Sequence, residues 1–252
     1  MELAPTLKLP LTNVSVTAAG TAGFCVRLSE KLSELGADVY TVPHVRIAEY
    51  ETVPLLDKAL EHPEDYGCIA FTGRNGAEIF LRRMRDKGID IRRLSSAKIA
   101  AIGNSTAGYL AGYGLYADIV PEVFTSAGLG KAITEKSDKS KRVLIARAEK
   151  GSDDLTDVLD SLAYSYDDIR LYDTVIDHSA VPERVDTDYI VFGSAAGING
   201  FINSGAELSE RIKIICIGSV TASAQSRYKN IITASPHTAE GIISAIITEE
   251  IK

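Results

Sequence analysis

The chain has 252 residues, of which 45% are hydrophobic and 24% are charged, and its formal net charge is −7. Such a chain can bury one sizeable core or two smaller ones. No stretch approaches the roughly 18 apolar residues of a membrane span, and the N-terminal segment lacks the features of a signal peptide. No Lys/Arg cluster has interleaved aromatic residues, which argues against nucleic-acid binding. We therefore expect a cytoplasmic protein with no nucleic-acid or membrane partner.

The cysteines and histidines show no pattern typical of metal binding. The three cysteines are far apart, and Cys68 and Cys216 stand within apolar runs, as small buried residues do. The four histidines form no HxxxH spacing, and the chain contains no GxGxxG after its first strand and no GxxxxGK[ST]. We expect neither a metal nor an organic cofactor.

Short apolar, β-branched runs alternate with segments whose apolar residues recur every three or four positions. This alternation is typical of α/β folds, in which helices flank parallel sheets. One helix is predicted between Ala77 and Met84, and the last from about Ala239. In chain order, strands are predicted at 14–17, 39–42, 68–72, 98–102, 118–120, 142–146, 168–172, 189–192, 213–217 and 230–233.

An internal repeat is the most informative feature of the sequence. IAFTGRNGAEIF from Ile69 aligns with IVFGSAAGINGF from Ile190 at a constant offset of 121 residues. KIAAIGNSTA from Lys98 matches KIICIGSVTA from Lys213, and a weaker pair joins VSVTAAG to VLIARAE. The repeat predicts two lobes of one βαβαβα plan, with a cleft between them.

The repeated motifs place small polar residues where strands lead into helices, which is where ligands bind in open parallel sheets. In GNSTA and GSVTA a glycine turns the chain, and Thr106 and Thr221 add a hydroxyl at the helix start. These features predict an anion cradle in each lobe. The alternative is that the two threonines only cap helices.

The second strand-to-helix junction offers Thr72, Arg74 and Asn75 in one lobe and Ser194 in the other as candidate donors. A guanidinium at a helix N-terminus is unfavourable for the helix dipole, which suggests that Arg74 binds an anion. The alternative is an ordinary exposed arginine.

Taken in order, these segments resemble the uroporphyrinogen-III synthase family over nearly the whole chain. The matching blocks are IAFTGRNGAEIF, IGNSTAGYLAGYGL with ADIVPEVFTSAGL, RVLIARAEKGSDDLTDVL with LYDTV, and IKIICIGSVTASA with SPHTAEGI. The second block is the most specific, because the family usually has a Gly-x-x-Thr-Ala turn, a proline and an aromatic-Thr-Ser-x-Gly helix start. The chain departs from the family where Gly73-Arg74 replaces a common Ser-Pro pair.

The resemblance implies a two-domain α/β fold and a reaction. Domain 1 would comprise residues 1–42 and 178–252, domain 2 residues 54–167, and two antiparallel linker strands residues 43–53 and 168–177. Hydroxymethylbilane would lose its hydroxyl as water to give an azafulvene, and a spiro intermediate would invert the last ring before closure to the type III macrocycle. The resemblance implies a cofactor-free monomeric lyase, and it leaves open an association with a uroporphyrinogen methyltransferase or a hydroxymethylbilane synthase.

The resemblance also assigns residues. Tyr172 in LYDTV matches the cleft tyrosine of the family and would donate a hydrogen bond to the leaving hydroxyl, the alternative being an aromatic that packs between lobes. Thr106, Thr221, Ser194 and Lys213 match other cleft positions, which would hold acetate and propionate groups. Two other functions stay open: a non-catalytic bilobed small-molecule-binding protein, and a sugar-nucleotide transferase, for which no phosphate motif is present.

Overall fold

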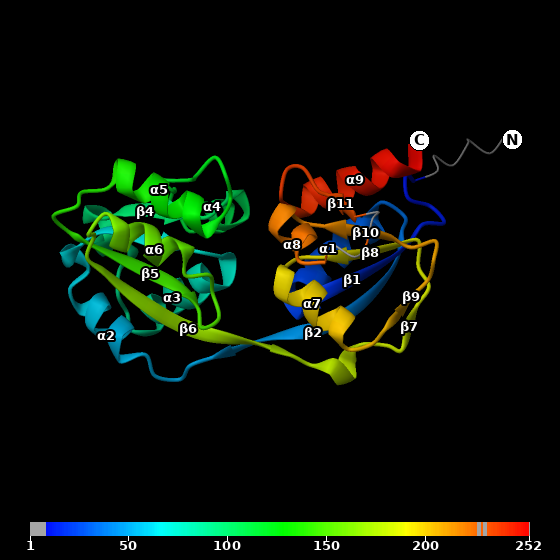
Figure 1. The fold of residues 1–252 in the computed structure, drawn as a ribbon, viewed down its shortest axis with the longest axis horizontal. Coiled ribbons are helices and arrows are strands. Elements are labelled where there is room, and N and C mark those ends of the chain that lie inside the picture. Colours follow the sequence, from blue (N-terminus) through cyan, green and yellow to red (C-terminus); the bar gives the residue numbers. More distant parts are fainter. Residues whose placement is uncertain (1–8, 226–227, 229–230, 252) are drawn as a thin grey trace, which may run out of the picture. The chain divides into compact units, whose positions relative to one another are not determined.

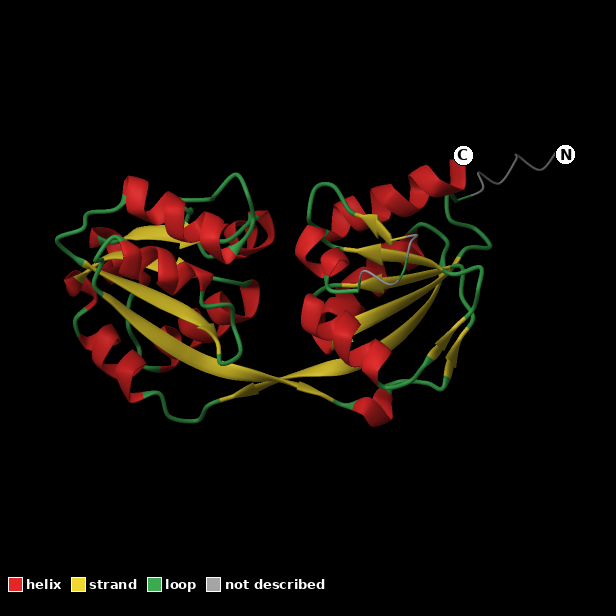
Figure 2. Cartoon of the chain, in the orientation of Figure 1, coloured by secondary structure: helices red, strands yellow, loops and turns green. Residues whose placement is uncertain are grey.

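The structure, a computed structural model, describes residues 9–225, 228 and 231–251. The chain divides into two compact units (Figure 1). Unit 1 combines Met1–Arg46 with Val175–Lys252, and unit 2 is the continuous stretch Ile47–Thr174. In each unit helices flank a parallel sheet (Figure 2), which confirms the predicted α/β class.

Unit 1 is built from both ends of the chain. Its strands are β1 (Ser15–Thr21), β2 (Asp38–Glu49), β7 (Arg184–Val185), β8 (Tyr189–Phe192), β9 (Glu207–Leu208), β10 (Lys213–Cys216) and β11 (Ile231–Thr233). Its helices are α1 (Ala22–Glu34), α7 (Ala195–Asn203), α8 (Ser219–Ser223) and α9 (Ala239–Ile251), with a 3₁₀ turn at His178–Ala180.

Unit 2 is formed by the middle of the chain. Its strands are β3 (Tyr66–Phe71), β4 (Lys98–Ala101), β5 (Arg142–Ala148) and β6 (Tyr166–Ile176). Its helices are α2 (Pro54–Glu61), α3 (Arg74–Asp86), α4 (Asn104–Ala111), α5 (Ser126–Lys136) and α6 (Asp154–Ser161), with 3₁₀ turns at Pro63–Asp65 and Ile91–Ser96. The unit boundaries fall within β2 and β6, so these two strands carry the chain from one unit to the other.

The strand order is the same in the two units. It runs β11-β10-β8-β1-β2 in unit 1 and, read from the other end, β4-β3-β5-β6 in unit 2, and the pairs described within each unit are parallel. An isolated bridge from Ile119 to Ala100 stands where β11 pairs with β10. The predicted strand at 118–120 is therefore reduced to this bridge.

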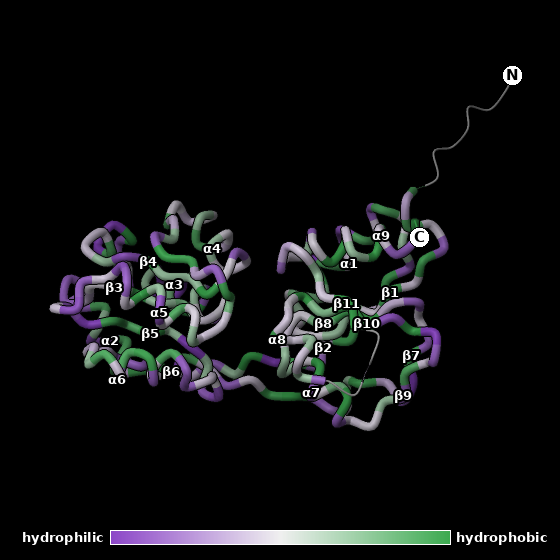
Figure 3. The backbone as a smooth tube through the Cα atoms, turned by 45° about the horizontal axis from the view of Figure 1, so that its top comes forward, coloured by the Kyte–Doolittle hydropathy of each residue, from purple (hydrophilic) through white to green (hydrophobic). Residues whose placement is uncertain are grey.

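The apolar runs form strands because both faces of each sheet are covered. In β3, Ile69 and Phe71 pack with α2 and α3, whereas Cys68 and Ala70 pack with α5 and α6 on the other face. This two-sided burial is expected of parallel sheets. Figure 3 shows the hydrophobic runs of β5 and β10 within their units.

Most predicted strands lie within two residues of the observed ones, except that β1, β2 and β6 extend several residues beyond the C-terminal ends of the predicted segments. The two-residue strands β7 and β9, which pair with each other, were not predicted because two residues show no periodicity. Residue 230 of the last predicted strand lies outside the described residues.

Candidate functional site

In unit 2 the predicted polar residues gather at the carboxyl edge of the sheet, where its parallel strands end. Thr72 follows β3, and Arg74 and Asn75 open α3. The end of β4 lies beside the end of β3, because the Ile102 N–H donates to the Phe71 carbonyl at 3.0 Å. Thr106 lies in the first turn of α4 at this same edge.

Tyr172 belongs to β6, and its side chain is 7% exposed. The Asn75 side chain lies within hydrogen-bonding reach of its hydroxyl, which brings two of the predicted residues together. Burial raises the pKa of Tyr172, and the hydrogen bond from Asn75 lowers it by less, so the net pKa lies above the ordinary value. The phenol is therefore protonated at neutral pH, and its own proton is available to a further acceptor.

Arg74 has an aromatic partner. Its guanidinium lies over the Tyr109 ring, with Cζ 4.5 Å from the ring centroid, a cation–π geometry. Tyr109 in turn donates to the Tyr113 hydroxyl at 3.1 Å. Among the described residues, the Arg74 Nε is the one buried side-chain nitrogen or oxygen without a hydrogen-bond partner. The arginine is thus neither an ordinary exposed residue nor paired with a carboxylate in the described part of the chain.

Thr106 and Thr221 occupy equivalent places in α4 and α8, and they are 3% and 4% exposed. Each of these helices has a glycine as its N-cap, Gly103 or Gly218, and no side chain makes a capping hydrogen bond. The alternative in which the threonines cap their helices is therefore wrong. The first N–H groups of both helices remain available to an anion.

In unit 1, Ser194 is the N-cap of α7, and its Oγ accepts a hydrogen bond from the Gly197 N–H at 3.1 Å. Ser194 and Thr221 both follow strand ends, of β8 and β10, at the carboxyl edge of unit 1.

Lys213 lies elsewhere. It opens β10, and its Nζ is 3.2 Å from Glu249 Oε2 and 5.5 Å from the centroid of the Tyr189 ring. A residue at the start of a parallel strand lies at the amino edge, so the structure does not bring Lys213 together with Ser194 and Thr221. Lys213 therefore lies outside the candidate site.

A cluster of charged residues beside Tyr172 was not among the predicted site residues. Arg147 of β5 and Arg170 of β6 both bind the Asp168 carboxylate, and the Arg147 side chain is only 1% exposed. The available signal was the presence of arginine and aspartate inside the otherwise apolar strand segments VLIARA and DDIRLY.

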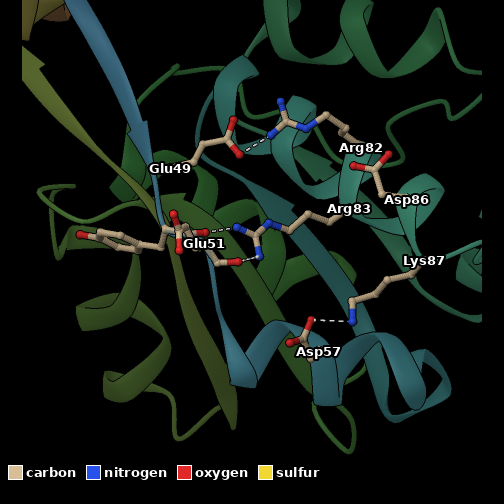
Figure 4. A pocket seen from close by; sticks show the side chains of 8 residues that line it. Glu49, Glu51, Asp57, Arg82, Arg83, Asp86 and Lys87 are labelled. Carbon is tan, nitrogen blue, oxygen red and sulfur yellow. Dashed lines mark hydrogen bonds and ion pairs between the residues drawn. The ribbon is translucent and has the colours of Figure 1, made fainter.

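A charged pocket of about 530 Å³ lies beside the C-terminal half of α3 (Figure 4). Its basic residues have partners: Arg82 pairs with Glu49, Arg83 donates to the carbonyls of Tyr50 and Glu51, and Lys87 lies 3.0 Å from Asp57. None of the predicted site residues lines this pocket, so the candidate residues at the first turn of α3 are separate from the ion pairs near its end.

Among the described residues, no group of His, Cys, Asp or Glu side chains is arranged to hold a metal ion. In the same ranges, no helix is long and apolar enough to cross a membrane.

Comparison with known proteins gives a consistent result. The family model described as uroporphyrinogen-III synthase HemD matches residues 26–244. A porphyrin biosynthesis protein HemD from Ruminiclostridium josui is 30% identical over 96% of this chain, which spans 49% of that relative's length. A uroporphyrinogen-III synthase from Synechococcus elongatus is 22% identical, with 94% of this chain and 96% of the relative covered.

Solved structures share the fold. A uroporphyrinogen III synthase from Thermus thermophilus superposes with a TM-score of 0.63 at 16% identity, covering 94% of this chain and 98% of that one. The corresponding protein from Helicobacter pylori gives a TM-score of 0.58 at 14% identity, covering 94% and 99%.

Proposed function

We propose that this chain, which belongs to the uroporphyrinogen-III synthase family, cyclises hydroxymethylbilane to uroporphyrinogen III with loss of water and inversion of the last pyrrole ring. The match of the family model to residues 26–244 is the observation that carries this proposal. The Synechococcus elongatus relative supports it, because this chain spans 96% of a protein that bears the name of the activity.

The outcome of the reaction depends more on the conformation in which the substrate is held than on strong acids or bases. Loss of the hydroxyl as water leaves an azafulvene that closes unaided to the wrong isomer. The enzyme therefore has to hold the chain in the conformation that leads through the spiro intermediate, by proximity and orientation. The hydroxyls, amides and helix N-termini at the carboxyl edges of the two units suit that task.

Tyr172 is our candidate for assisting the first step. The leaving hydroxyl needs a proton or a hydrogen bond to depart as water, and a protonated phenol supplies one. Burial keeps the Tyr172 pKa above its ordinary value, and the Asn75 amide occupies a lone pair of the phenol oxygen, which leaves the O–H free to donate. Asn75 thus fixes the phenol in place.

The carboxylates of the substrate are the proposed ligands of the remaining residues. Thr72, Arg74 and Thr106 would bind them in unit 2, and Ser194 and Thr221 in unit 1. Arg74 brings a buried Nε without a hydrogen-bond partner in the described part of the chain, which a carboxylate oxygen would satisfy. With a net charge of −7, the protein has to bind a polyanion through such local donors.

We further propose that the enzyme is a cytoplasmic lyase that works without a cofactor. Exhaustive chelation should leave its activity unchanged, and activity that is lost on chelation and restored by one metal would contradict this.

The deciding experiment is an isomer assay. The protein is mixed with hydroxymethylbilane that is generated enzymatically in the same vessel, and the oxidised products are separated by chromatography. We expect the type III isomer to dominate, whereas the heat-denatured protein gives the type I isomer of unaided closure. Only type I product in both samples would overturn the proposal and favour a non-catalytic binding protein.

A further inference from the structure

Arg147 is buried in unit 2 and has a matched set of partners. Its Nε lies 2.7 Å from Asp168 Oδ1 and its Nη2 2.8 Å from Asp168 Oδ2, so the guanidinium grips the carboxylate with both branches. Arg170 donates to the same carboxylate from its Nε at 2.9 Å. Burial would raise the pKa of Asp168, but hydrogen bonds from the two arginines outweigh it and hold the pKa below its usual value.

The cluster lies at an irregularity in the pairing of β5 and β6. Arg147 pairs with Arg170, but the next residue, Ala148, pairs with Tyr172, so Leu171 is an extra residue in β6. Successive side chains of a regular strand face opposite sides, yet Leu171 and Tyr172 are both buried in the same apolar cluster. A bulge re-aims a side chain in this manner. The direction of the Tyr172 side chain therefore depends on the bulge.

The two arginines also hold the segment that follows β5. Arg170 donates to the Glu149 carbonyl, and Arg147 donates to the Ser152 carbonyl. The Glu149 N–H in turn donates to the Tyr172 carbonyl at 2.7 Å. A continuous set of hydrogen bonds thus leads from the arginines to the backbone of Tyr172.

The equivalent strand pair of unit 1, β1 and β2, has a bulge without such a cluster of charged side chains. There Ala19 pairs with Val42 and Thr21 with Val45, so one extra residue stands in β2. Val16 pairs with Tyr189 of β8, and Val143 pairs with Cys68, the counterpart of Tyr189 in the repeat. Counted from these two residues, Gly20 and Pro43 occupy the places of Arg147 and Arg170. Buried ion pairs often add little stability beyond what apolar residues of similar volume provide. The charged cluster of unit 2 therefore has a task other than making the bulge.

We infer that Arg147 is a positioning residue, which acts with Asp168 and Arg170 to fix the β6 bulge so that the Tyr172 hydroxyl stays on the Asn75 amide. The inference rests on the proposed function for its kinetic consequence. The effect of Arg147 on the contact between Tyr172 and Asn75 is expected whatever reaction the protein catalyses.

The kinetic test is a double-mutant cycle. Arg147→Lys keeps the charge but loses the bidentate hydrogen bonding to Asp168. It should lower kcat for the type III isomer about 5- to 20-fold, while KM changes less than about 2-fold. In a Tyr172→Phe background the same substitution should have no further effect on kcat, because the hydroxyl it positions is gone. A stabilising role alone would give equal losses in both backgrounds.

The matched control is Arg142→Gln. Arg142 and Asp167 form an ion pair between the same two strands at their amino ends, far from Tyr172. This variant should leave kcat within about 2-fold of the wild type. If Arg147→Lys does not fold, Arg170→Gln, whose side chain is partly exposed, takes its place in the cycle.

The second readout needs no activity. In the ¹⁵N spectrum, the Asn75 side-chain amide is assigned by its loss in Asn75→Ala. Arg147→Lys should move this resonance toward its position in Tyr172→Phe, and Arg142→Gln should leave it in place. An unmoved resonance, or kinetic losses that add in the double variant, would overturn the inference. If the wild type made no type III isomer, the proposed function would be wrong. The shift of the Asn75 resonance would still test whether Arg147 positions Tyr172.

Discussion

The two units repeat one another in their packing and differ in their polar residues. In unit 2, Phe71 and Phe80 meet edge to face, with centroids 5.3 Å apart and rings at 76°. In unit 1, Phe192 and Phe201 do the same at 5.4 Å and 71°. Pairs at equivalent places in the repeat with equivalent geometry indicate that the core of one unit is a copy of the other.

A tight turn is repeated as well. Thr125 accepts a hydrogen bond from the Gly128 N–H at 3.1 Å, and Thr238 accepts one from the Gly241 N–H at 3.3 Å. In each unit the threonine N–H donates to the carbonyl two residues earlier, that of Val123 or Pro236. A Cβ on either glycine would overlap that same carbonyl oxygen.

The carboxyl edges have diverged. Arg74 and Asn75 of unit 2 correspond to Ala195 and Ala196 of unit 1, and Tyr172 corresponds to Val45. Residues that both units keep, such as the Phe pairs, thus maintain the scaffold. Residues found in one unit alone are candidates for the proposed chemistry, since a reaction that inverts a single ring would need an asymmetric site.

The shared turn predicts the largest effect. Gly128→Ala and Gly241→Ala should each lower the free energy of unfolding by about 3 kcal/mol, because the new methyl group collides with backbone that cannot move aside. Urea denaturation measures the change. Gly108→Ala in α4 is the control: a Cβ there meets nothing within 4 Å, and alanine favours the helix. A loss in one unit but not the other would break the equivalence of the turns.

The divergent edge predicts the next effect. Tyr172→Phe should keep the fold and slow type III formation about 10- to 100-fold, or roughly 1.4 to 2.7 kcal/mol, through loss of one hydrogen bond in the transition state. Single-turnover kinetics with isomer analysis measures it. Tyr164→Phe removes another buried phenol, one that donates to the Thr134 carbonyl, and should retain the wild-type rate. A wild-type rate in Tyr172→Phe would remove the tyrosine from the reaction.

The shared threonines should have a smaller effect, and an equal one in both units. Thr106→Ala and Thr221→Ala should each raise KM about 2- to 5-fold, since the neighbouring N–H groups still bind the carboxylates. Thr134→Ala, which removes an exposed hydroxyl on α5, should leave KM unchanged. A large loss for one threonine alone would show that the two helix starts bind different groups.

The smallest effect concerns the carboxylate of Glu240, a charged group of unit 1 that has no counterpart at the equivalent place in unit 2. Glu240 of α9 pairs with Lys31 at 2.7 Å, whereas Ala127 stands at the equivalent place in α5. The hydrogen bond from Lys31 lowers the pKa of Glu240 to about 2. Because the folded pKa is depressed, this carboxylate stabilises the fold above its ordinary pKa near 4.5, and the contribution is lost as the pH falls toward 2.

Glu240→Ala should therefore cost less than about 1 kcal/mol at pH 7, since the pair is exposed, and the difference should shrink between pH 5 and pH 3. Urea denaturation at four pH values measures it. A difference that grew on acidification would contradict the assignment of the shift to Lys31.

The repeat made most of the fold predictable, because buried parallel strands leave continuous apolar runs in the sequence. Its weakest pair needs a correction: β1 aligns with β5 as SVTAAGT on RVLIARA, two residues away from the alignment of VSVTAAG with VLIARAE. A one- or two-residue slip is invisible where both strands are buried on both faces, since the residues do not alternate.

The candidate site was predictable only in part. The positions of Thr72, Asn75 and Thr106 at the ends of strands could be predicted, because each residue follows an apolar run in the sequence. The sequence did not indicate that Asn75 contacts Tyr172, or that Arg147 is buried, since both depend on which strands are neighbours and on a bulge. Lys213 was misplaced because a family match does not tell the start of a strand from its end.

Unit 1 is assembled from two separate stretches of chain, and this affects its folding on the ribosome. At about 5 to 20 residues per second, β8 emerges roughly 7 to 30 seconds after the Met1–Arg46 stretch, and β1 has to wait for it as a sheet neighbour. Unit 2 is continuous and can fold in that interval. Val16 and Leu28, fully buried in the folded protein, meanwhile have no β8 to pack against. Equal losses of stability should therefore reduce the yield of the nascent protein more when they fall in unit 1 than in unit 2.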